Sequence, residues 1–274
     1  MHLPAQTDAA ADRFPMIRIW EEYPVTAGFT VRQGGFSRGP YAALNLALHV
    51  GDDAARVIQN RALFFRMLQQ DPKQAIFAEQ VHGHRAVVVT SREGGAGVWQ
   101  TADAIARCDA LVCGQTGVLL NILVADCVPI LLYDPVHNAV AAVHAGWRGT
   151  VSGSVDAAVA SMRMAFGTLP HQILAVVGPS IGPCCYAVGS SVAQAVQEQA
   201  SFLGAALGWR GATQYFDLWM ANRLRLNRLG IDRVQVLGQC TFCHSDQYFS
   251  YRASNGTCGR MAGFIRMDGR ETSG

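Results

Sequence analysis

The chain has 274 residues, half of them hydrophobic and 15% charged, so it can bury a sizeable core without metals or disulfides. A net charge of +2 without a basic block gives no sign of a nucleic-acid-binding surface. Residues 1–14 contain no apolar run typical of a signal peptide, and aspartates and prolines interrupt the apolar region 117–147. We therefore expect a soluble cytoplasmic protein with no nucleic-acid or membrane partner, for which a monomer is plausible.

The first half of the chain is expected to be rich in strands. Residues 1–20 predict a loose N-terminal arm, which would precede a single catalytic domain over 21–274. A glycine-rich loop over 34–41 is followed by a helix that Asp52 or Asp53 can cap. Short apolar segments predict strands over 26–32, 85–90, 108–113, 118–125, 130–133 and 139–144.

The second half is expected to be mainly helical. Helices are predicted over 155–166, 188–207 and 218–229, and buried strands over 173–177 and 234–237. The polar, glycine-rich segment 242–265 is expected to fold back over the functional site. Because short turns join neighbouring strands, we predict one α/β (α+β) domain with mixed, largely antiparallel sheets flanked by helices.

Three short stretches suggest a metal site: QVHG at 80–83, ADCVP at 125–129 and HAGWRG at 144–149. His82, Cys127 and His144 within them offer two imidazoles and a thiolate, which are good zinc ligands and leave a fourth position open. All three are predicted at strand ends or in turns, where reactive residues are commonly carried. The spacing matches no zinc finger, so from the residues alone a buried cysteine beside two unrelated histidines is about as plausible.

The remaining cysteines are expected to be free thiols or metal ligands, because the chain is long and no secretory signal is predicted. Cys184 and Cys185, together with Cys240 and Cys243, are candidates for a second metal site. One CxxC motif and one vicinal pair are weak evidence for metal binding. Buried structural thiols are therefore the favoured interpretation of these four residues.

The stretches around His82, Cys127 and His144, in this order, resemble the YfiH-like family, also called the multicopper polyphenol oxidoreductase (laccase) family. The resemblance covers about residues 24–266, and one departure is Cys258, which interrupts a run that is more typically Thr-Gly-Arg. Further matching blocks are GGFS at 34–37, LNL at 44–46, HVGDD at 49–53, NR at 60–61, GPSIGPCCY at 178–186, FSYR at 249–252 and TCGRM at 257–261.

The resemblance implies a fold related to the catalytic domain of cytotoxic necrotizing factor toxins. It implies zinc bound by His82, Cys127 and His144, and purine nucleoside phosphorylase activity on adenosine, inosine or methylthioadenosine, with possible adenosine deaminase activity. The family name also implies copper-dependent phenol oxidation, and some relatives are linked to cell-wall precursor editing. Thiolate and imidazole ligands favour zinc over magnesium or calcium, and only weakly over copper. A multicopper oxidase would need more histidine pairs than the single HxH at His82 and His84.

Phosphorolysis also requires groups that bind phosphate and the nucleoside. Arg148 is the first candidate for phosphate because a guanidinium can bind it bidentately, although a surface salt bridge is an alternative. Asp126 is a candidate for orienting a ligand histidine or for capping a turn. The substrate-binding candidates are Ser37, Asn45, Arg61, Arg148 and Tyr251. Of these, Ser37 could belong to an ordinary loop, and Asn45, Arg61 and Tyr251 could brace the core.

A second interpretation uses the same two residues for different chemistry. Cys127 could be a nucleophile activated by His144, as in a cysteine hydrolase acting on an amide. His82 favours the metal, because a cysteine hydrolase does not need a second histidine in the same coordination sphere. A third interpretation is a metal-binding or partner-binding protein without catalytic activity.

Overall fold

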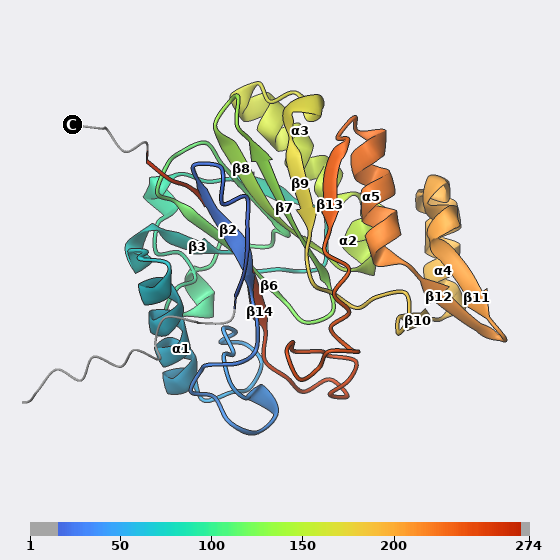
Figure 1. Ribbon diagram of the computed structural model, residues 1–274, viewed down its shortest axis with the longest axis horizontal. Helices are drawn as coiled ribbons and strands as arrows, with labels where there is room; N and C mark the ends of the chain where they lie inside the picture. Colours follow the sequence, from blue (N-terminus) through green and yellow to red (C-terminus); the bar gives the residue numbers. More distant parts are fainter. Residues whose placement is uncertain (1–15, 270–274) are drawn as a thin grey trace, which may run out of the picture.

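Two β-sheets that pack face to face form the centre of the protein, for which a computed structural model describes residues 16–269 (Figure 1). The first sheet has the strand order β1 (Met16–Ile19), β2 (Val25–Thr30), β14 (Met261–Met267), β6 (Leu119–Val124) and β3 (Ala75–Phe77). The second has the order β13 (Arg233–Val236), β9 (Leu174–Val177), β7 (Val128–Asp134), β8 (Ala139–Ala145), β5 (Ala110–Cys113) and β4 (Ala86–Val88).

Most neighbouring strands in these sheets are antiparallel. The parallel pairs are β3 with β6, β4 with β5, and β9 with β13. The mixed, largely antiparallel arrangement predicted from the short connections is confirmed.

Alternating side chains of the strands divide the core into layers. In β6, Leu120 and Ile122 point between the two sheets, whereas Leu119 and Leu123 pack toward the aromatic residues of α1 (Ala54–Met67). On the far face of the second sheet, the core is completed by α3 (Ser154–Phe166) and α5 (Leu218–Arg228). Successive side chains of a strand point to opposite faces of its sheet, so each sheet packs on the other sheet with one face and on helices with the other. The layers therefore follow the order helix, sheet, sheet, helix.

The helix predicted over 188–207, with a break at Gly204, is confirmed only over Ser190–Gln199. The segment instead forms β10 (Ala187–Val188), α4 (Ser190–Gln199), a 3-10 segment (Ser201–Ala206) and the start of β11 (Leu207–Arg210). Gly211, with φ of +59°, turns β11 back into β12 (Thr213–Phe216), and the three strands make a small sheet. The glycine-containing hairpin and burial of Leu203 override the helical periodicity of the segment.

Two further predictions need correction. Met16–Ile19, which fell within the predicted arm, pairs with β2 as a strand, while residues 1–15 lie outside the described residues. The segment predicted to fold over the site does so only in part, because Met261–Met267 is a central strand of the first sheet. A Cβ at Gly263 would lie 3.0 Å from the Pro129 Cβ, so this glycine allows the close approach of the two sheets.

Among residues 16–269, none of the helices has the length and hydropathy required to cross a bilayer.

Candidate active site

Cys127 lies in the turn where the chain passes from β6 of one sheet to β7 of the other. His144 is near the end of β8 and pairs in register with Pro129, which places its ring beside that turn. His82 belongs to the loop after β3, with φ of +58°. The ligand atoms of the three residues lie within 4.8 Å of one another, so the fold brings together the trio singled out from the sequence.

The carboxylate that orients this trio belongs to Asp109, directly before β5, a residue that no sequence motif indicated. Asp109 is fully buried, and its Oδ1 accepts a hydrogen bond of 2.8 Å from Nδ1 of His144. It also accepts backbone N–H groups of residues 81–83, with distances of 2.9 Å from His82 and 2.7 Å from Gly83. Because Nδ1 of His144 is engaged, Nε2 is the atom left to face a metal. One carboxylate therefore fixes both histidines.

Charges within the trio favour a thiolate. Burial raises the pKa of Cys127, but the charge of His144 and hydrogen bonds from His144 and His82 outweigh it and lower the pKa to about 6. Burial lowers the pKa of His144, whereas the Cys127 charge and the Asp109 hydrogen bond raise it to about 9. The deprotonated sulfur is the form that binds metal or attacks an electrophile, so both functions of Cys127 remain chemically feasible.

A cavity of about 720 Å³ opens beside the trio. Tyr186 and Tyr251 bring aromatic rings to its wall, and Arg252 and Arg260 bring positive charge. The Arg252 guanidinium lies 5.3 Å from the Tyr186 ring centre, and that of Arg260 lies 5.5 Å from the ring centre of Tyr251. Other residues of the wall are His49, Glu79, Gln80, Thr101, Leu123, Asp126 and Ile181. Tyr251 is 51% exposed, so it is a surface of the cavity and not part of the core.

Asp126 does not orient a ligand histidine. Its Oδ1 accepts a hydrogen bond of 2.6 Å from the Thr241 hydroxyl, and its Oδ2 accepts one of 2.6 Å from the backbone N–H of Arg252. Both bonds fasten the loop that carries Arg252 to the turn that carries Cys127. Asp126 therefore shapes the cavity wall, and the hydrogen bond to a histidine of the trio is made by Asp109 instead.

Three predicted substrate-binding residues lie in the scaffold outside the cavity wall. The Ser37 hydroxyl donates to Asp52, and the Asn45 amide donates to the same carboxylate. The guanidinium of Arg61 is buried, and its Nε and Nη1 donate to the backbone carbonyls of residues 46, 97 and 98. Asn45 acts on the cavity only indirectly, because its Oδ1 accepts the backbone N–H of Arg260.

Arg148 is also absent from the cavity wall. It is the second residue of α2 (Trp147–Ser152), and the buried side of this helix contains Gly149 and Thr150. The Arg148 side chain is exposed and stacks over Trp147, 4.4 Å from the ring centre. In this structure the arginines that face the cavity are Arg252 and Arg260.

The glycine that precedes α2 gives a test of how closely the trio is packed. A Cβ at Gly146 would lie 2.9 Å from Sγ of Cys127 and 3.2 Å from Cδ2 of His82. We expect Gly146→Ala to weaken metal binding by about 10-fold, because both ligands must shift. Competition with a chromophoric chelator measures the effect, and Gly189→Ala, where an added Cβ meets no atom within 4 Å, is the control. Equal affinities of the two variants would contradict the packing described.

Comparison with known proteins agrees with this architecture. Residues 26–268 match the family model described as multi-copper polyphenol oxidoreductase laccase. The chain belongs to this family. It is 38% identical to purine nucleoside phosphorylase YlmD of Geobacillus stearothermophilus over 87% of this chain and 89% of that one. It is 37% identical to purine nucleoside phosphorylase YlmD of Bacillus subtilis, with coverages of 92% and 94%.

Solved structures of family members have the same fold. The crystal structure of the hypothetical protein YfiH of Bacillus licheniformis superposes with a TM-score of 0.90 at 34% identity, covering 94% of this chain and 98% of that chain. The YfiH-like resemblance and the α/β fold class predicted from the sequence are both confirmed.

The donor set of the site fits a zinc ion. Two imidazoles and one thiolate within 4.8 Å of one another are typical zinc ligands. Three protein ligands leave a fourth position for another ligand, and all three residues line the cavity. A multicopper cluster needs further histidines, and His49 is the only other histidine among the residues of the cavity wall. The described residues therefore fit one metal ion at this position better than several.

Proposed function

We propose that this chain is a zinc-dependent purine nucleoside phosphorylase, in which phosphate displaces the purine base from C1′ of the ribose. The observation that carries the proposal is a His–Cys–His trio at the edge of a cavity lined by tyrosines and arginines. The names of similar members of the family support the same activity. His82, Cys127 and His144 would hold the zinc, which when bound supplies a Lewis acid able to polarise an electron-rich atom of the substrate.

The aromatic part of the cavity wall suits the nucleoside. The rings of Tyr186 and Tyr251 offer flat apolar faces, and a purine ring stacks well on such a face. A volume of about 720 Å³ is within the range of cavities that hold molecules of this class. Adenosine, inosine and methylthioadenosine are the proposed substrates.

The charged part of the wall suits phosphate. Arg252 and Arg260 present guanidinium groups, which bind phosphate oxygens in pairs. His49 lies in the same wall, where burial and then the charges of Arg260 and Arg61 lower its pKa. At neutral pH this imidazole is uncharged, so it can donate one hydrogen bond and accept another beside the anion.

The two assignments of the phosphate site can be compared directly. We expect Arg260→Ala to raise the KM for phosphate by roughly 10-fold or more, since a charge-assisted hydrogen bond contributes about 1.5–3 kcal/mol. Arg148→Ala should change this KM by less than about 2-fold, because the side chain stacks on Trp147 at the surface. Initial rates at varied phosphate and saturating nucleoside give both values. A larger increase of the KM for phosphate in Arg148→Ala than in Arg260→Ala would instead assign the phosphate site to Arg148.

Purified protein incubated with adenosine or inosine and phosphate tests the proposed reaction. Free base and ribose 1-phosphate should form in equal amounts, and omission of phosphate should abolish both. Ammonia or inosine from adenosine would show additional deamination. If no free base forms with any of the three nucleosides in zinc-loaded protein, the proposal fails. Reaction rates of metal-depleted protein, measured after addition of zinc or of copper, decide which metal supports the reaction. A cytoplasmic location is a further prediction.

A cysteine hydrolase is the second candidate, favoured by one specific observation. The Cys127 thiol interacts with His144, and His144 Nδ1 lies 2.8 Å from Asp109, which gives the order nucleophile, base and orienting carboxylate. Such an enzyme would attack an amide through Cys127 without a metal. Alkylation of Cys127 by iodoacetamide in the protein as isolated would favour it.

A further inference from the structure

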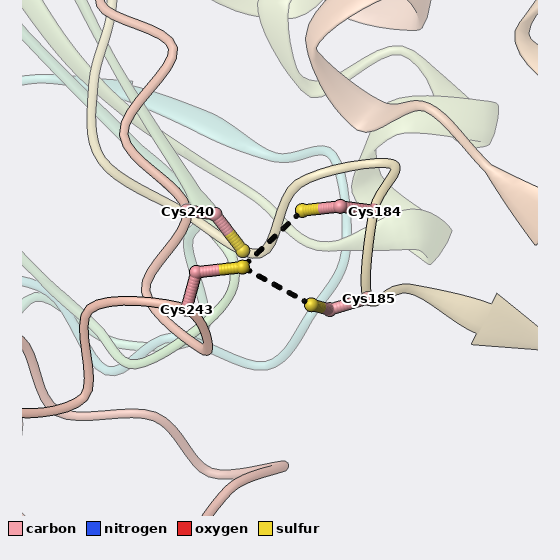
Figure 2. A group of neighbouring side chains, drawn as sticks. All are labelled: Cys184, Cys185, Cys240 and Cys243. Carbon is pink, nitrogen blue, oxygen red and sulfur yellow. Dashed lines mark hydrogen bonds between the residues drawn. The ribbon is translucent and has the colours of Figure 1, made fainter.

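Four cysteines outside the active site converge at one point on the surface. Cys184 and Cys185 lie in the loop between β9 and β10, and Cys240 and Cys243 lie in the loop that follows β13 (Figure 2). Because β9 and β13 are parallel neighbours, their carboxyl ends meet at the same sheet edge, and the two loops begin side by side. The four sulfurs lie within 4.8 Å of one another.

The distances between the sulfurs fit a single tetrahedral ion. Sγ of Cys243 lies 3.6 Å from that of Cys184 and 3.4 Å from that of Cys185. Tetrahedral zinc with Zn–S bonds of about 2.3 Å places its sulfurs about 3.8 Å apart, whereas sulfurs in a disulfide are about 2.05 Å apart. A four-iron cluster would hold its cysteines further apart, because the irons and inorganic sulfides lie between them.

One of the four sulfurs accepts a hydrogen bond that suits a thiolate. Sγ of Cys240 accepts the backbone N–H of Gly182 at 3.2 Å, a hydrogen bond that stabilises negative charge on sulfur. The four were expected to be buried structural thiols, but Cys184 and Cys243 are exposed and only Cys240 is buried. Exposed thiols at this separation do not contribute to a hydrophobic core. Thiolates so close together require a cation to balance their charge.

We propose that Cys184, Cys185, Cys240 and Cys243 bind one zinc ion in a closed, structural four-cysteine site. All four coordination positions would be filled by protein, so this ion would take no part in catalysis. It would join the loops after β9 and β13, which are already connected by a bridge between Ser180 and Cys240. Binding would release the protons of the thiols to solvent.

The proposed ion would stabilise one wall of the active-site cavity. The first loop carries Ile181 and Tyr186, which line the cavity. In the second loop, Thr241 follows Cys240 directly and donates its hydroxyl to Asp126, the residue before Cys127. The four-cysteine site is thus connected to the cavity by short paths on both loops.

Metal counting on the full-length protein tests the proposal without any assay of turnover. Protein purified with a reductant and without chelators should contain two zinc ions per chain by mass spectrometry of the elements. Cys243→Ser and Cys127→Ser should each lose one ion, and the double variant should lose both. Cys113→Ala, which changes a buried cysteine of strand β5 outside both groups, should retain two. Because each site is removed separately, failure of the four-cysteine site and failure of the active-site zinc give different results.

Two further measurements guard against misfolding as an explanation. Cys184 is exposed, so Cys184→Ser should give the same loss of one ion with an unchanged circular dichroism spectrum. Cobalt bound to the Cys127→Ser variant should show intense sulfur-to-metal charge-transfer bands, which Cys243→Ser in the same background abolishes.

Loss of the ion from the four-cysteine site should also lower the thermal midpoint of unfolding on the order of 10 °C. A zinc content that Cys243→Ser leaves unchanged, a disulfide among the four cysteines, or iron in place of zinc would overturn the proposal.

Discussion

Asp109→Asn is expected to weaken zinc binding at the His82–Cys127–His144 site by about 10- to 100-fold, and to reduce phosphorolysis in proportion. The carboxylate accepts hydrogen bonds from the His144 ring and from the backbone at His82 and Gly83. An asparagine offers only one acceptor oxygen, and its NH2 group would face an N–H donor. The His144 tautomer and the loop of His82 would then lose their common anchor. Chelator competition gives the affinity, and kcat/KM with saturating zinc separates lost metal from misplaced ligands.

Asp134 provides a matched control for this variant. It too is fully buried, and its Oδ2 lies 2.9 Å from Nδ1 of His137 while Oδ1 accepts the backbone N–H groups of Val136 and His137. Asp134→Asn should therefore destabilise the fold by a comparable amount but leave zinc affinity unchanged. If the two variants lose zinc equally, Asp109 acts only through general stability and its positioning function is refuted.

The reason Asp109 was not predicted is that all its contacts are distant in sequence. Its partners precede it by 26–28 residues or follow it by 35, and no local motif connects them. The available signal was an acidic residue at the start of the apolar run 108–113, where a buried charge needs partners. His82, Cys127 and His144 were selected because short distinctive stretches surround each of them. Local patterns identified the ligands, and only the pairing of β5 with β8 brought in the residue that orients them.

The difference between local sequence patterns and contacts made by the fold also explains why three residues predicted to bind substrate lie outside the cavity wall. Ser37, Asn45 and Arg61 occur in family blocks, and such blocks include scaffold as well as site. Arg61 is the clearest case, since burial lowers its pKa to about 9 and its donors satisfy backbone carbonyls. A motif shows that a residue type is needed at a position. Whether the need is structural or chemical depends on which way the side chain points, which the sequence does not specify.

Strand and helix positions were predictable where the hydrophobic period was long. The helix capped by Asp53 is confirmed, because its side chain accepts the N–H of Ala55 at the start of α1. The strand β14 was not predicted, because Gly263 and Arg266 interrupt its apolar pattern. Its position in the middle of a sheet depends on partners β2 and β6, which are far away in the sequence.

His82→Ala distinguishes the zinc phosphorylase from the cysteine hydrolase, because only the first needs this residue. We expect the variant to lose its active-site zinc and at least about 100-fold of phosphorolysis, while the contacts that Cys127, His144 and Asp109 make with one another remain. A hydrolase that depends on those three residues would retain most of its activity. His84→Ala, an exposed histidine of the same loop outside the trio, is the control and should behave as wild type.

Reactivity of Cys127 provides a second readout of the same variant. In zinc-loaded wild type, the thiolate is coordinated and should resist iodoacetamide, whereas chelator-treated protein should react at neutral pH. The charge of His144 and hydrogen bonds from His144 and His82 outweigh burial and lower the pKa of this thiol to about 6. Because the pKa is lowered, the alkylation rate of metal-free protein should rise as pH increases through about 6 and then level off. In His82→Ala one of these stabilising partners is missing, so the inflection should move to higher pH and zinc should no longer protect. Alkylation of Cys127 in zinc-loaded wild type as fast as in metal-free protein would mean that the sulfur is not a ligand, and the hydrolase would then be the better account.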